Sequence, residues 1–285
     1  MTATFAVHLI KAVKANEMKA QLKGVALGDS WISPLDSTDS WSEYLLSLSL
    51  IDEKQKEDID RYSRKIGNAI SKGQGTLATK LWSSLEDLVE EYTGGINWYN
   101  IFADNSPALH LRNLYRQHSD AQNPLSRSIY RHVHYLHDDV DDKLGNLMNS
   151  KYLKEKLNIP DKVVWGSQSG DVFTQLSEDF MKPVINDVEY LLNETDIKVV
   201  VYTGQLDLIV DTLGTEAWIN KLNWKGLSNF KANKKEIFAG QLGRPQAFVK
   251  KEGNFSLYWI LKAGHMVPSD QLDVSVDMLK DVIKN

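Results

Sequence analysis

The segment IKVVVYTGQLD at residues 197–207 decides the fold that we expect for this chain of 285 residues. Its run of β-branched side chains predicts a buried strand. Gly204 predicts a turn after that strand, and Asp207 lies in the turn, just beyond the predicted strand end. A carboxylate at the end of a strand is a candidate for catalytic chemistry, which requires partner residues elsewhere in the sequence.

The segment LKAGHMVP at residues 261–268 repeats this design, with an apolar strand predicted before Gly264 and with His265 on the following loop. An acid after one strand and a histidine after a later strand is the chain order of the α/β-hydrolase triad. In such a triad the carboxylate orients the imidazole, and the imidazole takes the proton of the nucleophile. By spacing alone, a turn acid and an unrelated surface histidine explain Asp207 and His265 at least as well, so both interpretations stay open at this point.

The pattern around these segments predicts an α/β fold with an α/β-hydrolase-like, mostly parallel sheet and a large inserted helical cap. Further strands are expected at 22–29, 237–238, 247–250 and 257–261. Helices are expected at 42–50, 52–72, 77–92, 212–222 and 274–283, with mostly helical structure at 109–157 and one helix at 172–193 bent at Pro183. We therefore divide the chain into hydrolase core at 1–35, helical cap at 36–195, and hydrolase core with the acid and the histidine at 196–285.

The first residues predict an amphipathic helix with Phe5, Leu9, Val13 and Met18 on its packed face. Lysines and a histidine interrupt its apolar residues and no small-residue cleavage site follows, which does not fit a signal peptide. The chain is therefore expected to begin inside a domain.

Composition excludes several classes of function. The net charge of −5 argues against binding of nucleic acid through bulk positive charge. The absence of cysteine excludes disulfides, zinc–thiolate sites and a cysteine nucleophile. No apolar run approaches the roughly 20 residues that span a bilayer. We expect no nucleic-acid partner, no membrane span, no metal and no cofactor.

Three segments together carry a resemblance to a known family. The segment YTGQLDLIVDTLGTEAWINKL at 202–222 resembles the signature around the catalytic acid of the serine carboxypeptidases. KAGHMVPSDQ at 262–271 resembles their histidine signature, G-x-G-H-M-V-P-x-D-x-P, and VALGDSWISP at 25–34 resembles their Gly-Asn-x-x-x-x-Pro turn. The spacings agree over nearly the whole chain, and the similarity is greatest to the retinoid-inducible subgroup.

This resemblance implies a role for each matching residue. It implies that Asp207 is the catalytic acid and His265 the catalytic base of a hydrolase that removes C-terminal residues from peptides or proteins through an acyl-enzyme. It also implies a protein that is secreted or found in lysosomes or vacuoles, without a cofactor. Gln205 and Lys262 depart from the most common pattern, at positions that are not expected to transfer protons.

The family's nucleophile elbow, Gly-Glu-Ser-Tyr-Gly-Gly, does not occur in this sequence, and neither does any G-x-S-x-G. Ser169 in the segment GSQSG at 166–170 has the wrong frame and no strand before it. The resemblance covers the C-terminal two-thirds of a carboxypeptidase, with Met1 just after the elbow. Two hypotheses follow: a serine carboxypeptidase by family whose nucleophile lies outside this chain, or a catalytically inactive fragment or non-enzymatic binding protein.

Other residues have alternative interpretations. Asn193 and Asn254 begin sequons for N-glycosylation, a modification that requires entry into the secretory pathway. A metal cluster or, more simply, a solvated helix explains the histidines and aspartates of the segment HVHYLHDDVDD at 132–142. We expect the tryptophans at 31, 41, 98 and 165 to pack in the core or cap rather than to bind substrate.

Overall fold

The structure is a computed structural model that describes residues 1–103, 139–166, 169–238 and 243–284, with the side chains of residues 139–142 left aside. It contains two compact units. The first comprises Met1–Arg64, Trp98–Ala103 and Lys182–Asn285, and the second comprises Lys65–Asn97 and Asp104–Met181. The division into core and cap at 1–35, 36–195 and 196–285 stays a prediction.

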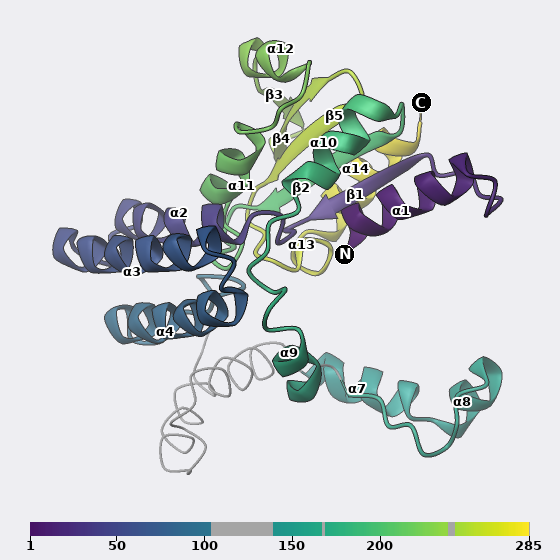
Figure 1. Cartoon of the computed structure of the whole chain (residues 1–285), viewed down its shortest axis with the longest axis horizontal. Coiled ribbons are helices and arrows are strands. Elements are labelled where there is room, and N and C mark those ends of the chain that lie inside the picture. The colour runs from purple at the N-terminus through teal and green to yellow at the C-terminus, as the bar shows by residue number, and fades with distance from the viewer. Residues whose placement is uncertain (104–138, 167–168, 239–242, 285) are drawn as a thin grey trace. The chain divides into compact units, whose positions relative to one another are not determined.

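The first unit is built on a mixed sheet of five strands in the order β1-β2-β5-β4-β3 (Figure 1). Strands β1 (Gly24–Gly28), β2 (Lys198–Gly204) and β5 (Phe255–Ile260) are parallel to one another. Strands β4 (Ala247–Glu252) and β3 (Glu236–Phe238) continue the sheet in antiparallel pairs. The predicted α/β class and the predicted strands are confirmed.

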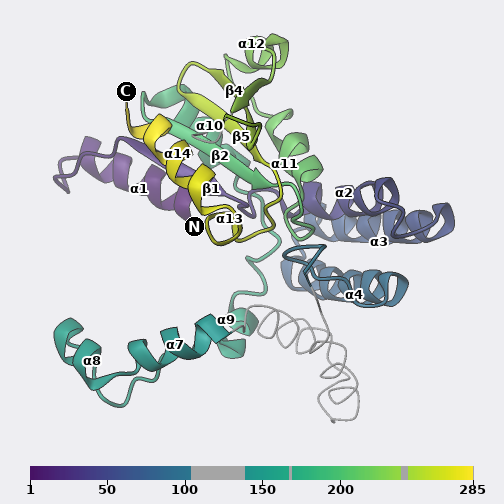
Figure 2. The same cartoon turned by 180° about the vertical axis from the view of Figure 1, so that it is seen from behind.

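Strand β2 is buried on both faces, and its side chains alternate between two apolar clusters, as the two-residue period of a strand requires. Val199 and Val201 pack on one face with helices α1 (Thr2–Lys14), α10 (Ile185–Glu194), α11 (Thr212–Ile219) and α12 (Leu227–Ala232). Val200 packs on the other face with α14 (Leu272–Ile283) and with Val267 of the short helix α13 (Val267–Asp270). Figure 1 shows α1 and α10 in front of the sheet, and Figure 2 shows α14 in front of the opposite face.

The predicted helical region between β1 and β2 is confirmed where the structure describes it. Besides α10, its described helices are α2 (Pro34–Ser47), α3 (Glu53–Ser71), α4 (Gly75–Thr93), α7 (Asp139–Met148), α8 (Lys151–Leu157) and α9 (Gly170–Gln175). The part of the predicted 109–157 helical stretch before residue 139 lies outside the described residues. Helix α2 begins at Pro34, earlier than predicted, because proline is well suited to the first helical position.

The prediction of one bent helix over 172–193 is wrong. Helix α9 ends at Gln175 and α10 begins only at Ile185. Pro183 lacks the N–H that would continue a helix, and the N–H of Val184 donates to the carbonyl of Ile32 (2.8 Å) instead of to the preceding helical turn. The first helix has thus ended eight residues before Pro183, and a separate helix begins just after this proline.

The predicted packed face of the N-terminal helix is also wrong. The buried residues of α1 are Ala3, Ala6 and Val7, whereas Phe5 is 71% exposed. Met18 lies beyond the end of the helix. Small side chains let the helix axis lie close to the sheet, so the face with alanines rather than the face with the largest apolar residues is buried.

Candidate active site

The two predicted site residues lie at the carboxyl ends of neighbouring strands. Asp207 follows β2 and His265 follows β5, and these strands pair in parallel, so both loops leave the sheet at the same edge. His265 Nδ1 lies 2.8 Å from Asp207 Oδ2. The side chain of Asp207 is fully buried, whereas that of His265 is 25% exposed. Nδ1 is occupied by the acid, which leaves Nε2 as the nitrogen available for proton transfer.

The two loops are fastened to each other by backbone hydrogen bonds. Gln205 N–H donates to the carbonyl of Ile260 (3.0 Å), and Leu206 N–H donates to that of Ala263 (2.7 Å). A Cβ at Gly204 would lie 2.1 Å from the carbonyl oxygen of Gly264, so only glycine allows this close approach. The acid and the histidine are thus positioned by main-chain contacts between their own loops.

Gln205 and Lys262, which depart from the common family pattern, contact each other. Lys262 has a φ of 61°, in the left-handed region, and its N–H donates to Gln205 Oε1 (3.3 Å). The Gln205 carbonyl also accepts from the hydroxyl of Tyr44 (2.8 Å). Both departures therefore support the shape of the loops rather than the chemistry of the pair.

Trp98 and Tyr99, which follow helix α4 in the chain, also support the loops of Asp207 and His265. The N–H of His265 donates to the carbonyl of Tyr99 (2.6 Å), and the Tyr99 ring meets the imidazole edge-on, with centroids 5.1 Å apart. The carbonyl of neighbouring Trp98 accepts from the N–H groups of Leu208 and Ile209. No sequence pattern indicates this role for Tyr99, because any residue type can supply a backbone carbonyl.

Burial and charge have opposite effects on the pKa of Asp207, and likewise on that of His265. Burial raises the pKa of Asp207, and the charge of His265 and the hydrogen bond to it only partly offset this effect. Burial lowers the pKa of His265, but the charge of Asp207 and their hydrogen bond raise it, and the pKa lies above the ordinary value as a result. The imidazolium form is thus favoured by the geometry, which is what a base that becomes charged during a reaction requires.

A second buried carboxylate, Asp211, caps helix α11. Asp211 Oδ1 accepts from the N–H of Gly214 (3.0 Å), and Oδ2 accepts from the hydroxyl of Ser40 (2.6 Å). Burial raises the pKa of Asp211 to about 7, and the charge of Asp207 adds to the rise. Asp211 thus anchors the acid loop to helix α2, and among the described residues it makes no hydrogen bond to His265.

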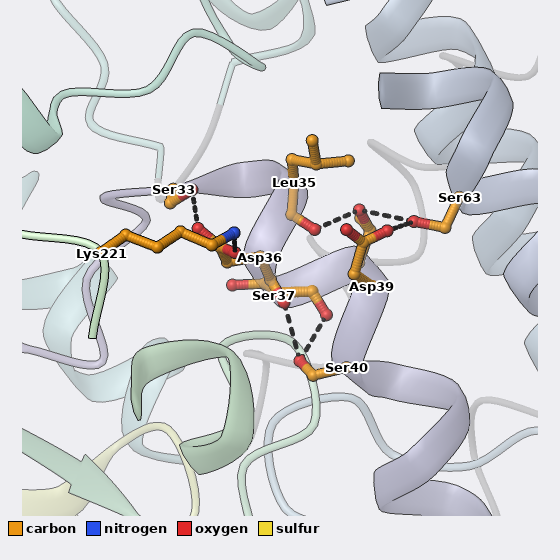
Figure 3. Close-up of polar contacts among 9 residues, drawn as sticks. Ser33, Leu35, Asp36, Ser37, Asp39, Ser40, Ser63 and Lys221 are labelled. Atoms are coloured by element: carbon orange, nitrogen blue, oxygen red, sulfur yellow. Dashed lines mark hydrogen bonds and ion pairs between the residues drawn. The ribbon is translucent and has the colours of Figure 1, made fainter. Parts of the chain in front are cut away.

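Polar contacts on α2 extend this anchor, as Figure 3 shows. The hydroxyl oxygen of Ser40 also lies within hydrogen-bond distance of the carbonyl oxygens of Asp36 and Ser37 (2.9 Å each). Asp36 accepts from Ser33 (2.6 Å) and forms an ion pair with Lys221, which follows α11. Helix α2 is therefore joined to the start of α11 through Asp211 and to the residues just after α11 through Lys221.

The hydrogen bonds of the other candidate residues, Ser169, Asn193 and Asn254, do not involve Asp207 or His265. Ser169 caps α9, where its hydroxyl accepts from the N–H of Val172 (3.4 Å). The amide group of Asn193 donates to the carbonyl of Asn223 (2.8 Å), and that of Asn254 donates to the carbonyls of Thr195 and Ile197.

Trp41 and Trp98 are fully buried with ring centroids 4.7 Å apart, as expected of packing residues. His132, His134, His137 and Asp138 lie outside the described residues, and the described part of the chain contains no group of acidic and histidine side chains arranged to hold a metal ion. No helix in the described ranges combines the length and the apolar character needed to cross a membrane.

Comparison with known proteins gives consistent results. The sequence model of a family described as "Serine carboxypeptidase" matches residues 1–285. The chain is 44% identical over 282 residues to "Retinoid-inducible serine carboxypeptidase" of Rattus norvegicus, covering 98% of this chain and 61% of that protein. It is 37% identical over 288 residues to "Serine carboxypeptidase-like 51" of Arabidopsis thaliana, covering 97% of this chain and 61% of the relative.

A solved structure shares the fold. The crystal structure of Kex1Δp, a prohormone-processing carboxypeptidase from Saccharomyces cerevisiae, superposes with a TM-score of 0.71 at 20% identity, covering 99% of this chain and 59% of that one. The chain thus spans about 61% of the length of the two relatives described above.

Proposed function

We propose, from the premise that this chain belongs to the serine carboxypeptidase family, that it supplies the acid and the base of a peptidase acting on the C-termini of peptides or proteins. The observation that carries the proposal is the 2.8 Å contact between Asp207 Oδ2 and His265 Nδ1 at adjacent strand ends. In such a reaction His265 Nε2 removes the proton from a serine hydroxyl as its oxygen attacks the peptide carbonyl. Asp207 holds the Nδ1–H tautomer and stabilises the imidazolium that forms.

The remaining steps follow from the same pair. His265 gives its proton to the leaving amine, which frees the terminal residue and leaves an acyl-enzyme. Water then attacks the acyl group, His265 takes a proton from that water, and the proton returns to the serine oxygen as the peptide acid leaves. The printed sequence contains no G-x-S-x-G, so we place the serine in a segment of the family that the 285 residues do not include.

The setting of the reaction is part of the proposal. We infer a protein of the secretory pathway, secreted or in lysosomes or vacuoles, in which Asn193 and Asn254 are the sites available to N-glycosylation. Support comes from the family and from the sequons, while the hydrogen bonds that both amide groups already make disfavour modification of the folded chain.

A fluorophosphonate probe, which reacts with activated serines, tests the proposal. We expect no labelling of the 285-residue chain, and labelling of a longer chain that continues upstream through a Gly-Glu-Ser-Tyr-Gly-Gly elbow, for instance one grafted from the rat relative. His265→Ala should abolish labelling of the longer chain because the serine loses its base. His8→Ala, at an exposed position of α1, is the matched control and should label normally.

Two results would overturn the proposal. One is stoichiometric labelling of a serine within the 285 residues. The other is a longer chain that folds and labels at the same rate with and without His265. A folded longer chain that never labels would support the alternative of an inactive or binding protein.

A further inference from the structure

A third strand end delivers a carboxyl group to the same place. Asp29 directly follows β1, the parallel neighbour of β2, and has a φ of 39°, in the left-handed region. Its N–H donates to the carbonyl of Tyr202 (3.0 Å), and its Oδ1 accepts from the N–H of Gly204 (2.9 Å). The left-handed backbone conformation directs the Asp29 side chain across the end of β2, towards the loop that carries Asp207.

The Asp29 carboxyl group is only partly satisfied there. The residue is 5% exposed, and its Oδ2 is buried without a hydrogen-bond partner among the described residues. The Asp207 carboxyl group is close enough to interact with Asp29 electrostatically. Within the described ranges no lysine or arginine forms an ion pair with Asp29 or Asp207, whose one ionic partner is His265.

Two carboxylates cannot both carry charge at such a place without a large cost. Neighbouring buried carboxyl groups relieve this cost by keeping one proton between them. A proton on Asp29 would also turn the unpartnered Oδ2 from an unsatisfied acceptor into a donor that can approach Asp207.

We propose that Asp29 is a positioning residue that keeps a proton facing Asp207, so that the two carboxyl groups carry a single negative charge while His265 titrates. The hydroxyl of Asp29 then donates to the Asp207 carboxylate and fixes its rotation, with Oδ2 directed at His265 Nδ1. This inference deepens the proposed function and rests on Asp207 and His265 being the acid and base of that site.

The surroundings decide which carboxyl group keeps the proton. Burial and then the charge of Asp207 raise the pKa of Asp29 well above its ordinary value, against the N–H of Gly204 and the side chain of Thr203. Asp207, in contrast, has the charge and hydrogen bond of His265 and the N–H groups of Val210 and Ile209 to favour its ionised form. The proton therefore belongs to Asp29.

The other titratable groups around the pair do not change this assignment. Asp211 interacts with Asp207 from the start of α11, but burial raises the pKa of Asp211 to about 7, so below that pH it adds little negative charge to the cluster. Burial raises the pKa of Tyr44 on α2 and, with the charge of Asp29, that of Tyr202 on β2, so both phenols stay neutral. His265 is thus the one cation that faces the cluster in the described ranges.

Asparagine is the informative substitution at this position, because its amide keeps a donor of similar shape but cannot ionise. The family turn that residues 25–34 resemble has asparagine at the matching position. We expect His265 in Asp29→Asn to titrate with a pKa within about 0.3 of the wild-type value, measured by nitrogen-15 NMR of the imidazole. If Asp29 were ionised in the wild type, removing its charge would lower the pKa of His265 by about one or more, which would overturn the proposal.

A second variant tests positioning rather than charge. Asp29→Ala removes the donor, so we expect the downfield resonance of the His265 Nδ1 proton to weaken or broaden, whereas Asp29→Asn should retain it. Equal resonances in the two variants would exclude a positioning role. Both experiments use the 285-residue chain and need no serine, so their outcome is independent of the probe labelling that tests the peptidase.

If Asp29→Ala does not fold, the wild-type chain still decides the question. Carbon-13 NMR of the aspartate carboxyl groups should contain one resonance that keeps its protonated shift through about pH 7 and is missing from Asp29→Asn. Because Asp211 titrates near the same pH, its resonance is identified by its loss from Asp211→Asn. An Asp29 resonance that titrates near the ordinary aspartate pKa of about 3.9 would overturn the proposal.

Discussion

Replacing Asp207 with asparagine removes the charge that faces His265 and nearly preserves the volume of the side chain. Burial then acts on the imidazole without the opposing carboxylate, so the pKa of His265 should fall below its ordinary value. The two groups are 2.8 Å apart, and the acid is fully buried. Unit charges about 4 Å apart interact with about 4 kcal/mol at an effective dielectric constant of about 20.

Because the imidazole is 25% exposed, we take about 3 kcal/mol as the interaction that is lost. This energy corresponds to a fall of about two in the pKa of His265, at about 1.4 kcal/mol for each pKa unit. The assay is the titration of the imidazole nitrogens by NMR in the 285-residue chain. A protonated imidazole should then exist only at acid pH, while the wild type stays protonated above its ordinary pKa.

Asp211→Asn is the matched control, since it removes another fully buried carboxyl group, one that forms no hydrogen bond or ion pair with His265 among the described residues. It should change the pKa of His265 much less than Asp207→Asn does. Equal shifts in the two variants, or no shift in Asp207→Asn, would refute the assignment of Asp207 as the partner. In a longer chain with the serine, Asp207→Asn should reduce turnover by up to about 10⁴-fold, and a loss of less than about tenfold would make Asp211 the acid to test.

Three further predictions concern stability. Gly204→Ala should lower the free energy of unfolding by about 3 kcal/mol in urea titrations, because the added Cβ overlaps backbone oxygens. Gly145→Ala in α7 is the control, since its Cβ would meet only an ordinary van der Waals contact, and it should be neutral or slightly stabilising. Because the pKa of Asp211 is about 7 in the folded state, its contribution to the free energy of unfolding is complete below about pH 4 and is lost progressively up to about pH 7. This loss is worth up to about 4 kcal/mol, and Asp211→Asn should remove it. A slope of unfolding free energy against pH that is equal in wild type and variant would contradict this. Asn254→Ala should cost about 1–2 kcal/mol by calorimetry, because the carbonyls of two half-buried residues lose their donor, and a cost near zero would show that water replaces the amide.

Much of the sheet could be predicted from the sequence because its strands are β-branched or apolar runs bounded by glycine. The ends of these runs also placed Asp207 and His265 correctly at the same edge, since parallel strands bring their carboxyl ends together. Choosing between a triad and two unrelated surface residues required the family resemblance, because spacing alone does not fix side-chain distance.

The parts that could not be predicted depend on contacts rather than on residue pattern. Tyr99 supports His265 through a backbone carbonyl, and any residue could supply one. Asp29 lies in a segment that resembles a turn, and only the pairing of β1 with β2 brings it to the same sheet edge as Asp207. The buried face of α1 follows the space available under the helix, which selected Ala3 and Ala6 over Phe5.

The pairing of β1 with β2 has a consequence for how the chain is made. Gly24 lies opposite Lys198, so β1 leaves the ribosome about 170 residues before the strand that it pairs with. At about 5–20 residues per second, this strand waits roughly ten to thirty seconds without its partner. Its short GVALG sequence, with glycine at both ends, limits the apolar edge exposed during that time. The cluster of Asp29, Asp207 and His265 can therefore assemble only after residue 265 has been synthesised, when the helical region between β1 and β2 is already complete and able to fold around its own contacts.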